Sequence, residues 1–315
     1  MINPFKYSDD NKRYNTFNYY LRHTYQSKVF KLALDAGFTC PNRDGTCGYG
    51  GCTYCSSAGS GEFAGDRNES IARQLQSQMT MMKHKWPNGQ AMAYFQAYTN
   101  TYADLADLKA LYDPLAHDDS LVAIAIATRA DCLDKAKINY FNELSQTKDI
   151  WIELGLQTIH DETAHLINRG HDYQTFLDCI NALSQTNIKT CVHIINGLPN
   201  ETEEMMLKTA QAVGQLPIDA IKIHMLHLLK GSKLGDLYRT KPFAILERKA
   251  YIDLVIKQLT YLKPEMVIER LTGDPPKQLL IAPEWTLNKT TILNDIDKKM
   301  AALDIMQGTN YKEQI

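Results

Sequence analysis

Strand-like stretches rich in aliphatic and β-branched residues alternate with helical patterns from about residue 28 to the end of the chain. We expect strands over residues 28–35, 91–96, 121–128, 150–157, 189–195, 220–228 and 266–271. We expect helices over residues 69–84, 104–112, 134–146, 173–184, 201–215, 246–262 and about 290–303. Parallel strands need crossover connections, so this alternation predicts a parallel sheet with helices outside it. Several strands are almost wholly apolar, which indicates burial on both faces.

An open doubly wound sheet and a full or partial barrel both fit this alternation. No G-x-G-x-x-G motif follows the first strand, so the dinucleotide-binding form of the open sheet has no support. Polar residues follow the carboxyl ends of several strands, where a parallel barrel keeps its active site. They are Gln96, Tyr98, Thr99, Asn100, Thr128, Arg129, Asp131, Gln157 and Asn196. We expect a catalytic barrel over residues 28–235, an N-terminal extension over 1–27 and a C-terminal extension over 236–315, all in one compact unit.

The composition predicts a cytoplasmic protein that does not enter a membrane. Its apolar runs are far shorter than the ~18 residues that a membrane span needs, and the first residues lack the apolar core of a secretory signal. Disulfides are rare in the reducing cytoplasm. The seven cysteines are therefore expected to be ligands, catalysts or packing residues.

The net charge of −2 is unevenly distributed along the chain. Residues 220–263 carry nine Lys and Arg against three acids, and residues 1–31 carry six against two. Basic regions on a nearly neutral protein suit a polyanionic substrate. The alternative is that these charges lie on solvated helix faces.

The first strand leads into a loop with four cysteines in sixteen positions, Cys40, Cys47, Cys52 and Cys55. Its glycines allow the backbone to fold tightly around a metal. Thiolates suit zinc or iron–sulfur clusters, and a four-cysteine zinc site remains the alternative because it also uses Cys-x2-Cys pairs. A position on the active-site rim of a barrel favours a 4Fe–4S cluster, in which three thiolates leave one iron open to another ligand.

This loop resembles that of the radical S-adenosylmethionine (SAM) superfamily, in a variant with eleven residues between Cys40 and Cys52. Longer matches resemble the branch related to the Elongator catalytic subunit, which includes bacterial MnmL (the YtqA type) and YhcC-type proteins. They cover residues 37–46, 94–102, 128–133, 153–158, 168–171, 193–199, 222–227 and 230–232, with a short match at 307–308. The resemblance extends over nearly the whole chain and implies a partial (β/α)6-type TIM barrel with SAM as a cofactor.

The resemblance also implies that Cys40, Cys52 and Cys55 hold the 4Fe–4S cluster. Cys47 matches no ligand of the family pattern and is interpreted as a spare thiol. The other cysteines lie in or beside predicted helices and strands, where we expect them to be packing residues. They are Cys132, Cys179 and Cys191.

The SAM site departs from the family pattern after the second strand. Many relatives have Gly-Gly-Glu there, whereas this chain offers Gln96-Ala-Tyr98-Thr-Asn100 as acceptors for the SAM amino group. The resemblance suggests that Glu153 binds the ribose of SAM. The alternative is an internal salt bridge, because a buried carboxylate is costly without a partner.

Further residues are expected at the SAM site. Gln157 and Arg169 are expected to contact the ribose or the carboxylate of SAM, although Arg169 is alternatively a solvated charge at a helix end. Asn196 and Gly197 would let the adenine approach the backbone. Tyr54 is expected beside the adenine, with an ordinary core aromatic as the alternative. Thr128 and His227 complete this predicted site.

Lys222, His224 and His227 lie along the sixth predicted strand. Alternation places Lys222 and His224 on one face of the strand and His227 on the other. We expect Lys222 and His224 to act in catalysis, with satisfied core residues as the alternative.

The resemblance implies a tRNA-modifying enzyme that acts on the wobble uridine. It would convert 5-carboxymethylaminomethyl(-2-thio)uridine to the 5-aminomethyl form through a 5′-deoxyadenosyl radical. The basic regions would bind phosphates of the anticodon stem-loop, and Tyr98 or Tyr102 would stack on the extruded base. A flavodoxin- or ferredoxin-type protein would supply electrons. Two alternatives stay open: an enzyme of the same branch acting on a small metabolite or a protein side chain, and a non-catalytic zinc-stabilised RNA-binding module.

Overall fold

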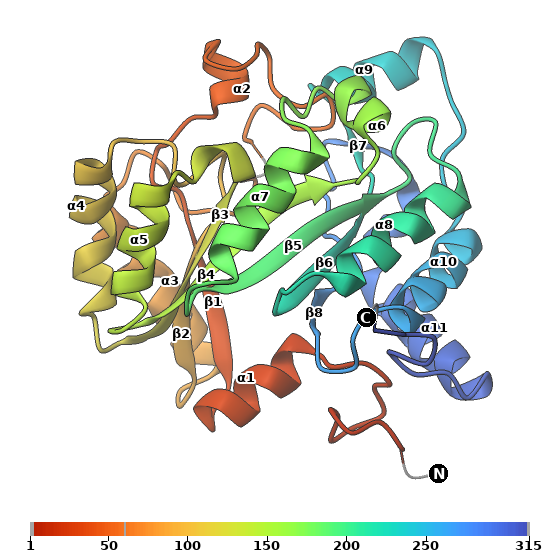
Figure 1. Ribbon diagram of the computed structural model, residues 1–315, viewed down its shortest axis with the longest axis horizontal. Coiled ribbons are helices and arrows are strands. Elements are labelled where there is room, and N and C mark those ends of the chain that lie inside the picture. The colour runs from red at the N-terminus through yellow and green to blue at the C-terminus, as the bar shows by residue number, and fades with distance from the viewer. Residues whose placement is uncertain (1–2, 60, 314–315) are drawn as a thin grey trace.

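The computed structural model describes residues 3–59 and 61–313, and a seven-stranded sheet curls through them as a half-barrel (Figure 1). All neighbouring strands in this sheet are parallel. In spatial order they are β1 (Val29–Leu34), β2 (Gln90–Phe95), β3 (Leu121–Thr128), β4 (Asp149–Gln157), β5 (Lys189–Asn196), β6 (Ala220–Met225) and β8 (Val267–Arg270). The predicted partial barrel is confirmed. Because β8 pairs with β6, the sheet continues past residue 235.

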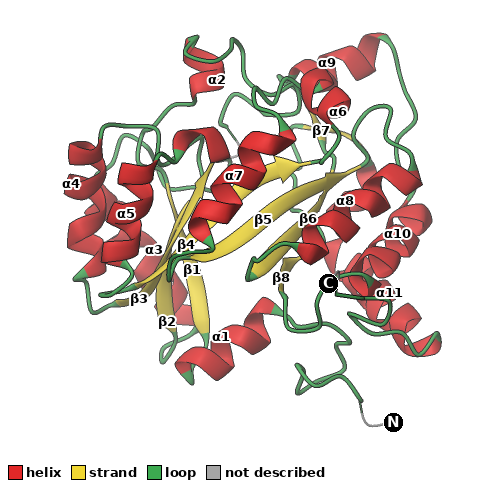
Figure 2. Ribbon diagram, in the orientation of Figure 1, coloured by secondary structure: helices red, strands yellow, loops and turns green. Residues whose placement is uncertain are grey.

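The long helices cover the outside of the sheet (Figure 2). They are α3 (Ile71–Lys85), α4 (Leu105–Ala116), α5 (Lys135–Leu144), α7 (Tyr173–Leu183), α8 (Glu203–Gln215), α10 (Arg248–Thr260) and α11 (Lys289–Ala302). These match the predicted helices, and α4 extends four residues further than expected. The sequence reading missed shorter elements that lack a long apolar period: α1 (Phe17–Tyr25), α2 (Pro41–Asp44), α6 (Asp161–Leu166), α9 (Lys233–Thr240), β7 (Leu228–Leu229) and β9 (Leu280–Ala282).

Both faces of the sheet are buried, as the apolar strands predicted. Outward side chains such as Leu32 and Ile152 form one cluster with the helices, and inward ones such as Met92 and Cys191 form a second cluster. Helix α1 packs against this inner cluster, where Phe17 and Tyr20 meet the ring of Trp151 edge-on. The amino end of the barrel is therefore filled. Cys191, Cys132 and Cys179 are buried, which agrees with their predicted packing role.

The two edges of the half-barrel are joined by side chains. In the part of the chain that the structure describes, β1 and β8 form no ladder with each other. Instead, Thr16 makes a single bridge to Ile268, and the Lys31 ammonium on β1 lies 2.7 Å from the Glu269 carboxylate on β8. Among the described residues, no helix combines the length and the apolarity needed to cross a membrane.

Candidate functional site

Cys40, Cys52 and Cys55 all line one cavity of about 650 Å³ at the carboxyl ends of the strands. The fourth thiol of the loop, Cys47, is exposed and is not among the residues that line it. The three cysteines that the family pattern selected are thus the three that the fold brings to one space.

The surroundings of Cys52 favour the anionic form of its thiol. The thiol of Cys55 donates to Cys52 and lowers the pKa of Cys52 to about 6, and the Arg129 guanidinium acts in the same direction against the effect of burial. In the described residues, no three His, Cys, Asp or Glu side chains come close enough to hold a single metal ion. A cluster occupies the space between its ligands, so thiols that face a shared cavity fit a cluster.

Asn42 and Asn168 fix the cysteine loop. Asn42 is fully buried at the start of α2 and donates to the Asn168 carbonyl. In return, the Asn168 amide donates to the Gly51 carbonyl at 2.8 Å. Gly48 has no room for a side chain, because a Cβ there would lie 2.2 Å from Asn42 Oδ1. The sequence analysis missed Asn42, because the only sign of its role in the sequence is its position two residues after Cys40.

A layer of buried and half-buried polar side chains crosses the barrel and forms the floor of the cavity. We call it the charged layer; it consists of Lys31, Tyr94, Glu153, His193, Lys222 and Glu269. The Lys31 ammonium lies 2.9 Å from the Glu153 carboxylate, and Lys222 bonds to Glu153 and lies 3.4 Å from Glu269. His193 Nε2 lies 2.9 Å from the second Glu153 oxygen. Two cations therefore face two carboxylates inside the barrel.

Glu153 lines the cavity, but its carboxylate is held by an internal salt bridge, which favours that alternative over a contact with the SAM ribose. Burial by itself would raise the pKa of Glu153, but Lys222 and Lys31 outweigh this effect and hold that pKa well below its usual range. Both carboxylate oxygens already have partners in the protein. Lys222 is buried in the same network and does not line the cavity, unlike His224.

The polar residues after β2 divide into two groups. Gln96 and Tyr98 line the cavity, whereas Asn100 is fully buried and does not. The Asn100 amide donates to the carbonyls of Ala97 and Ala127, each at 3.0 Å, and so holds the loop. Tyr98 donates its hydroxyl to the Ser57 carbonyl. Within the described residues, the side-chain amide of Gln96 makes no hydrogen bond, which leaves it open to a ligand.

Besides Glu153 and His227, four other predicted cofactor-binding residues line the same cavity. They are Tyr54, Thr128, Gln157 and Arg169. Burial, and then the neighbouring Cys52, raise the pKa of Tyr54 well above its usual value. Thr128 shares a hydrogen bond of 2.6 Å with the Thr101 hydroxyl.

Arg169 is buried, so its interpretation as a solvated charge is wrong. Its guanidinium donates to the carbonyls of Leu156, Thr158 and His171. These hydrogen bonds fix the backbone around Arg169, including Asn168, which contacts the cysteine loop.

Asn196 and Gly197 do not reach the cavity. The Asn196 side chain exchanges two hydrogen bonds with Gln258 on α10, at 2.8 and 2.9 Å. Gly197 lies against the Leu246 side chain and donates its N–H to the Met206 sulfur. The strand end was predicted correctly, but these contacts come from segments distant in sequence and turn both residues away from the site.

His224 and His227 both line the cavity, together with Arg270. The expectation that His227 lies on the opposite face is wrong, because β6 ends at Met225 and the alternation stops there. Burial lowers the pKa of both histidines, that of His227 to about 4. The sequence reading missed Arg270. Its signal was two successive charged residues, Glu269 and Arg270, at the end of a short apolar strand.

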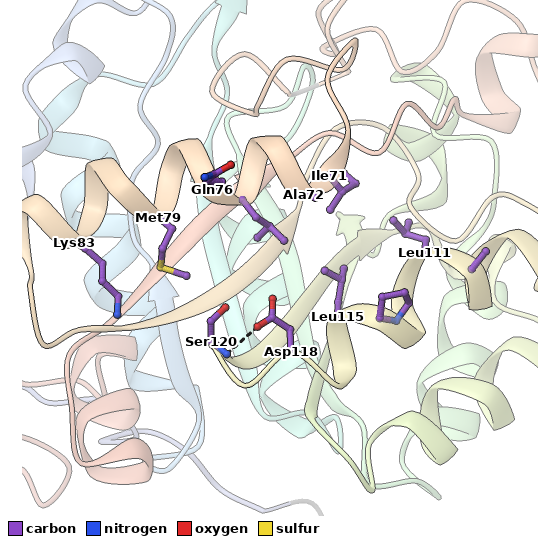
Figure 3. A pocket seen from close by; sticks show the side chains of 12 residues that line it. Ile71, Ala72, Gln76, Met79, Lys83, Leu111, Leu115, Asp118 and Ser120 are labelled. Carbon is purple, nitrogen blue, oxygen red and sulfur yellow. Dashed lines mark hydrogen bonds between the residues drawn. The ribbon is translucent and has the colours of Figure 1, made fainter.

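A second cavity, of about 540 Å³, lies between α3 and α4 (Figure 3). Side chains such as Ile71, Met79 and Leu115 line it, with Lys83 and Asp118 at its border. Its lining is mainly apolar and includes no thiol or histidine, so the chemistry of this chain belongs to the first cavity.

The two basic regions do not form one surface. Lys31 and Lys222 point into the barrel, and Lys257 and Arg248 are paired with acids. Figure 1 shows α1 and the N-terminal segment at the end of the barrel opposite α2 and α9. Residues 230–241 carry exposed cations on the side of the cysteine loop, since Leu234 there donates to the Thr53 carbonyl in that loop. We call Lys230, Lys233, Arg239 and Lys241 the rim cations.

The chain is similar in sequence and in fold to several known proteins. The chain is 46% identical to the Bacillus subtilis (strain 168) protein YtqA, over 98% of this chain and 96% of that one. It is 24% identical to the tRNA uridine(34) acetyltransferase of Methanocaldococcus infernus, over 51% of this chain and 30% of that protein. The solved structure of archaeal Methanocaldococcus infernus Elp3 with an N-terminal deletion has the same fold, with a TM-score of 0.65 and 16% identity, covering 89% of this chain and 64% of that one.

Family models account for most of the chain. The model of the radical SAM superfamily matches residues 42–213, and that of the radical SAM C-terminal domain matches residues 218–302. The resemblance of the cysteine loop is thereby confirmed. The chain belongs to the radical SAM superfamily, whose members bind a 4Fe–4S cluster and S-adenosylmethionine.

Proposed function

We propose that this protein modifies the wobble uridine of tRNA, converting 5-carboxymethylaminomethyl(-2-thio)uridine to the 5-aminomethyl form. The observation that carries the proposal is a cavity lined by three thiols at one end and by histidines and Arg270 elsewhere, with exposed cations on the side of the cysteine loop. The similarity to a tRNA uridine(34) acetyltransferase supports a tRNA substrate.

We assign cofactor binding to residues that line this cavity. Cys40, Cys52 and Cys55 hold the cluster, and the free Gln96 amide accepts a hydrogen bond from the SAM ammonium group. Bound there, the cluster and SAM supply a 5′-deoxyadenosyl radical. A flavodoxin- or ferredoxin-type protein delivers the electron. Tyr54 and Gln157 border the space for the remainder of SAM.

The reaction begins with removal of a hydrogen atom from the methylene between the amine and the carboxylate of the substrate arm. Passage of one further electron to an acceptor of the flavodoxin or ferredoxin class leaves an iminium ion. Water adds to this carbon, and the C–N bond breaks to release the aminomethyl group and glyoxylate. His224 lines the cavity, and its buried Nε2 has no hydrogen-bond partner among the described residues. We assign it the proton released by the attacking water.

Lys222 is assigned a positioning role instead of a catalytic one. Its ammonium lies between Glu153 and Glu269 in the charged layer, and it has no access to the cavity. It lies two residues before His224 on β6 and so fixes the strand that presents the histidine.

Nucleoside mass spectrometry tests the reaction. We expect tRNA from a deletion strain to accumulate the carboxymethylaminomethyl nucleoside, and the purified enzyme with SAM and reductant to convert it. Replacing Cys40, Cys52 or Cys55 by Ala should abolish the iron–sulfur spectrum and conversion, whereas Cys47→Ala should keep both. Unchanged wobble nucleosides in the deletion strain would direct the search to metabolite or protein substrates.

The rim cations provide a separate test of tRNA binding. Each phosphate contact that is removed should flatten the slope of log affinity against log salt by roughly 0.7–0.9. We therefore expect Lys230→Glu with Lys233→Glu to weaken tRNA binding and lower the salt slope, without affecting SAM cleavage in the absence of substrate. The matched control is Lys249→Glu with Lys298→Glu, two exposed cations on α10 and α11. Equal effects of the two pairs would exclude a specific role for the rim.

A further inference from the structure

Arg270 at the end of β8 lines the cavity with a guanidinium that the protein leaves unused. Among the described residues it makes no ion pair and no side-chain hydrogen bond. The other cavity arginines differ, because Arg129 pairs with Asp131 at 2.6 Å, Arg169 donates to three carbonyls, and Arg43 donates to two. A guanidinium is always charged and carries five N–H donors in a planar fork, which matches a carboxylate.

His227 lies on the same wall of the cavity and also lacks a partner. Its Nε2 is buried, and it forms no hydrogen bond with any described residue. The ring packs against Gly273, where a Cβ would lie 2.7 Å from His227 Cε1. The His227 ring therefore packs directly against the backbone at Gly273, where a side chain would not fit. Leaving such a buried polar atom unpaired costs free energy unless a ligand completes its hydrogen bond.

The two acids that flank Arg270 in the sequence have other cations as partners. Glu269, its neighbour on β8, points into the charged layer and contacts Lys31 and Lys222. Asp274 also lines the cavity, but it pairs with Lys289. Burial and the nearby Arg270 both oppose a proton on His227. This wall therefore offers one permanent positive charge and a neutral imidazole to an incoming group.

We propose that Arg270 and His227 bind a carboxylate of the substrate. The assignment rests on the proposed function, in which this group is the carboxylate of the carboxymethylaminomethyl arm. The guanidinium would take both carboxylate oxygens, and an N–H of His227 would donate to one of them. Held in this way, the neighbouring methylene, from which the hydrogen is removed, stays at a fixed place in the cavity that the three thiols line.

The test is a pair of anticodon stem-loop RNAs that differ only in the carboxylate. One carries 5-carboxymethylaminomethyluridine and the other 5-methylaminomethyluridine at the wobble position. We expect the SAM-loaded enzyme to bind the first RNA about 10- to 100-fold more tightly, as for a hydrogen-bonded charged group. Arg270→Gln should remove most of this preference, Arg270→Lys should keep part of it, and His227→Gln should reduce it less. Arg73→Gln, an exposed arginine on α3, is the matched control and should keep it.

The possible outcomes separate this inference from the proposed function. A wild-type enzyme without preference for the carboxylate, or a preference that survives in Arg270→Gln, overturns the subsite even if conversion of the wobble nucleoside is observed. If Arg270→Gln instead impairs SAM cleavage in the absence of RNA, the guanidinium serves the SAM carboxylate and the assignment is wrong. Failure of the wild-type enzyme to release the aminomethyl nucleoside contradicts the proposed function alone.

Discussion

The charged layer and the cavity wall above it are built from the same strands, two residues apart, yet they use their polar groups differently. Tyr94 on β2 belongs to the layer, and Gln96, directly after that strand, belongs to the wall. On β6, Lys222 belongs to the layer and His224 to the wall. In the layer, cations and carboxylates face one another at short distances. On the wall, some polar side chains, such as those of His224 and His227, face the cavity without partners in the described residues. Paired groups hold the barrel together, and unpaired groups are available to ligands.

The layer also has a mechanical role that the wall lacks. The edge strands β1 and β8 are joined through Lys31 and Glu269, on the side where the sheet does not close by backbone pairing in the described residues. Removing one partner from a buried ion pair typically costs more than the pair itself contributes, because a desolvated charge is left alone. Variants in the layer should therefore change stability, and variants on the wall should change binding.

The largest expected effect is that of Glu153→Gln in the layer. Lys31 and Lys222 would then share only Glu269, and we expect the free energy of unfolding to fall by about 3–5 kcal/mol. Urea denaturation measures this loss, and SAM affinity at a temperature where the variant stays folded should be unchanged. Weaker SAM binding with normal stability would instead support a contact between Glu153 and the ribose of SAM.

The second prediction concerns His227 on the wall, whose lowered pKa should make the stability of the protein depend on pH. The pKa of His227 is lowered from 6.5 to about 4, first by burial and then by Arg270, so the folded protein keeps this ring neutral where the unfolded chain binds a proton. The unfolded state binds more protons below pH 6.5, and stability therefore falls as the pH drops. This loss amounts to about 2 kcal/mol at pH 5.

His227→Gln cannot bind that proton. We expect the variant to lose about 2 kcal/mol less stability than the wild type between pH 7.5 and pH 5, as measured by urea denaturation at each pH. Parallel pH profiles for the two proteins would show that the ring is not held neutral in the fold.

The strands and the cluster loop were predictable from sequence because their signals are local. The apolar run of β3 and the spacing of Cys40, Cys52 and Cys55 depend on neighbouring residues only. Whether a polar side chain pairs within the protein or faces a ligand was not predictable, since its partners are distant in the sequence. Lys31 counted as part of a basic region, yet its partners are Glu153 and Glu269. Asn196 was placed in the site, yet it pairs with Gln258.

The smallest expected effect separates two amides from the same loop, Gln96 on the wall and Asn100 behind it. Gln96 makes no side-chain hydrogen bond with the described residues, whereas Asn100 holds two backbone carbonyls. Gln96→Ala should therefore weaken SAM binding by about 1.5 kcal/mol, roughly tenfold, with little change in stability. Asn100→Ala should instead lower stability, because it leaves buried carbonyls without a donor. Calorimetric titration with SAM and urea denaturation of both variants measure the two effects. If Asn100→Ala lowers the SAM affinity of the folded protein more than Gln96→Ala does, the SAM ammonium group depends on Asn100 instead of Gln96. The rule that unpaired side chains bind ligands and paired ones hold the fold would then be wrong for this loop.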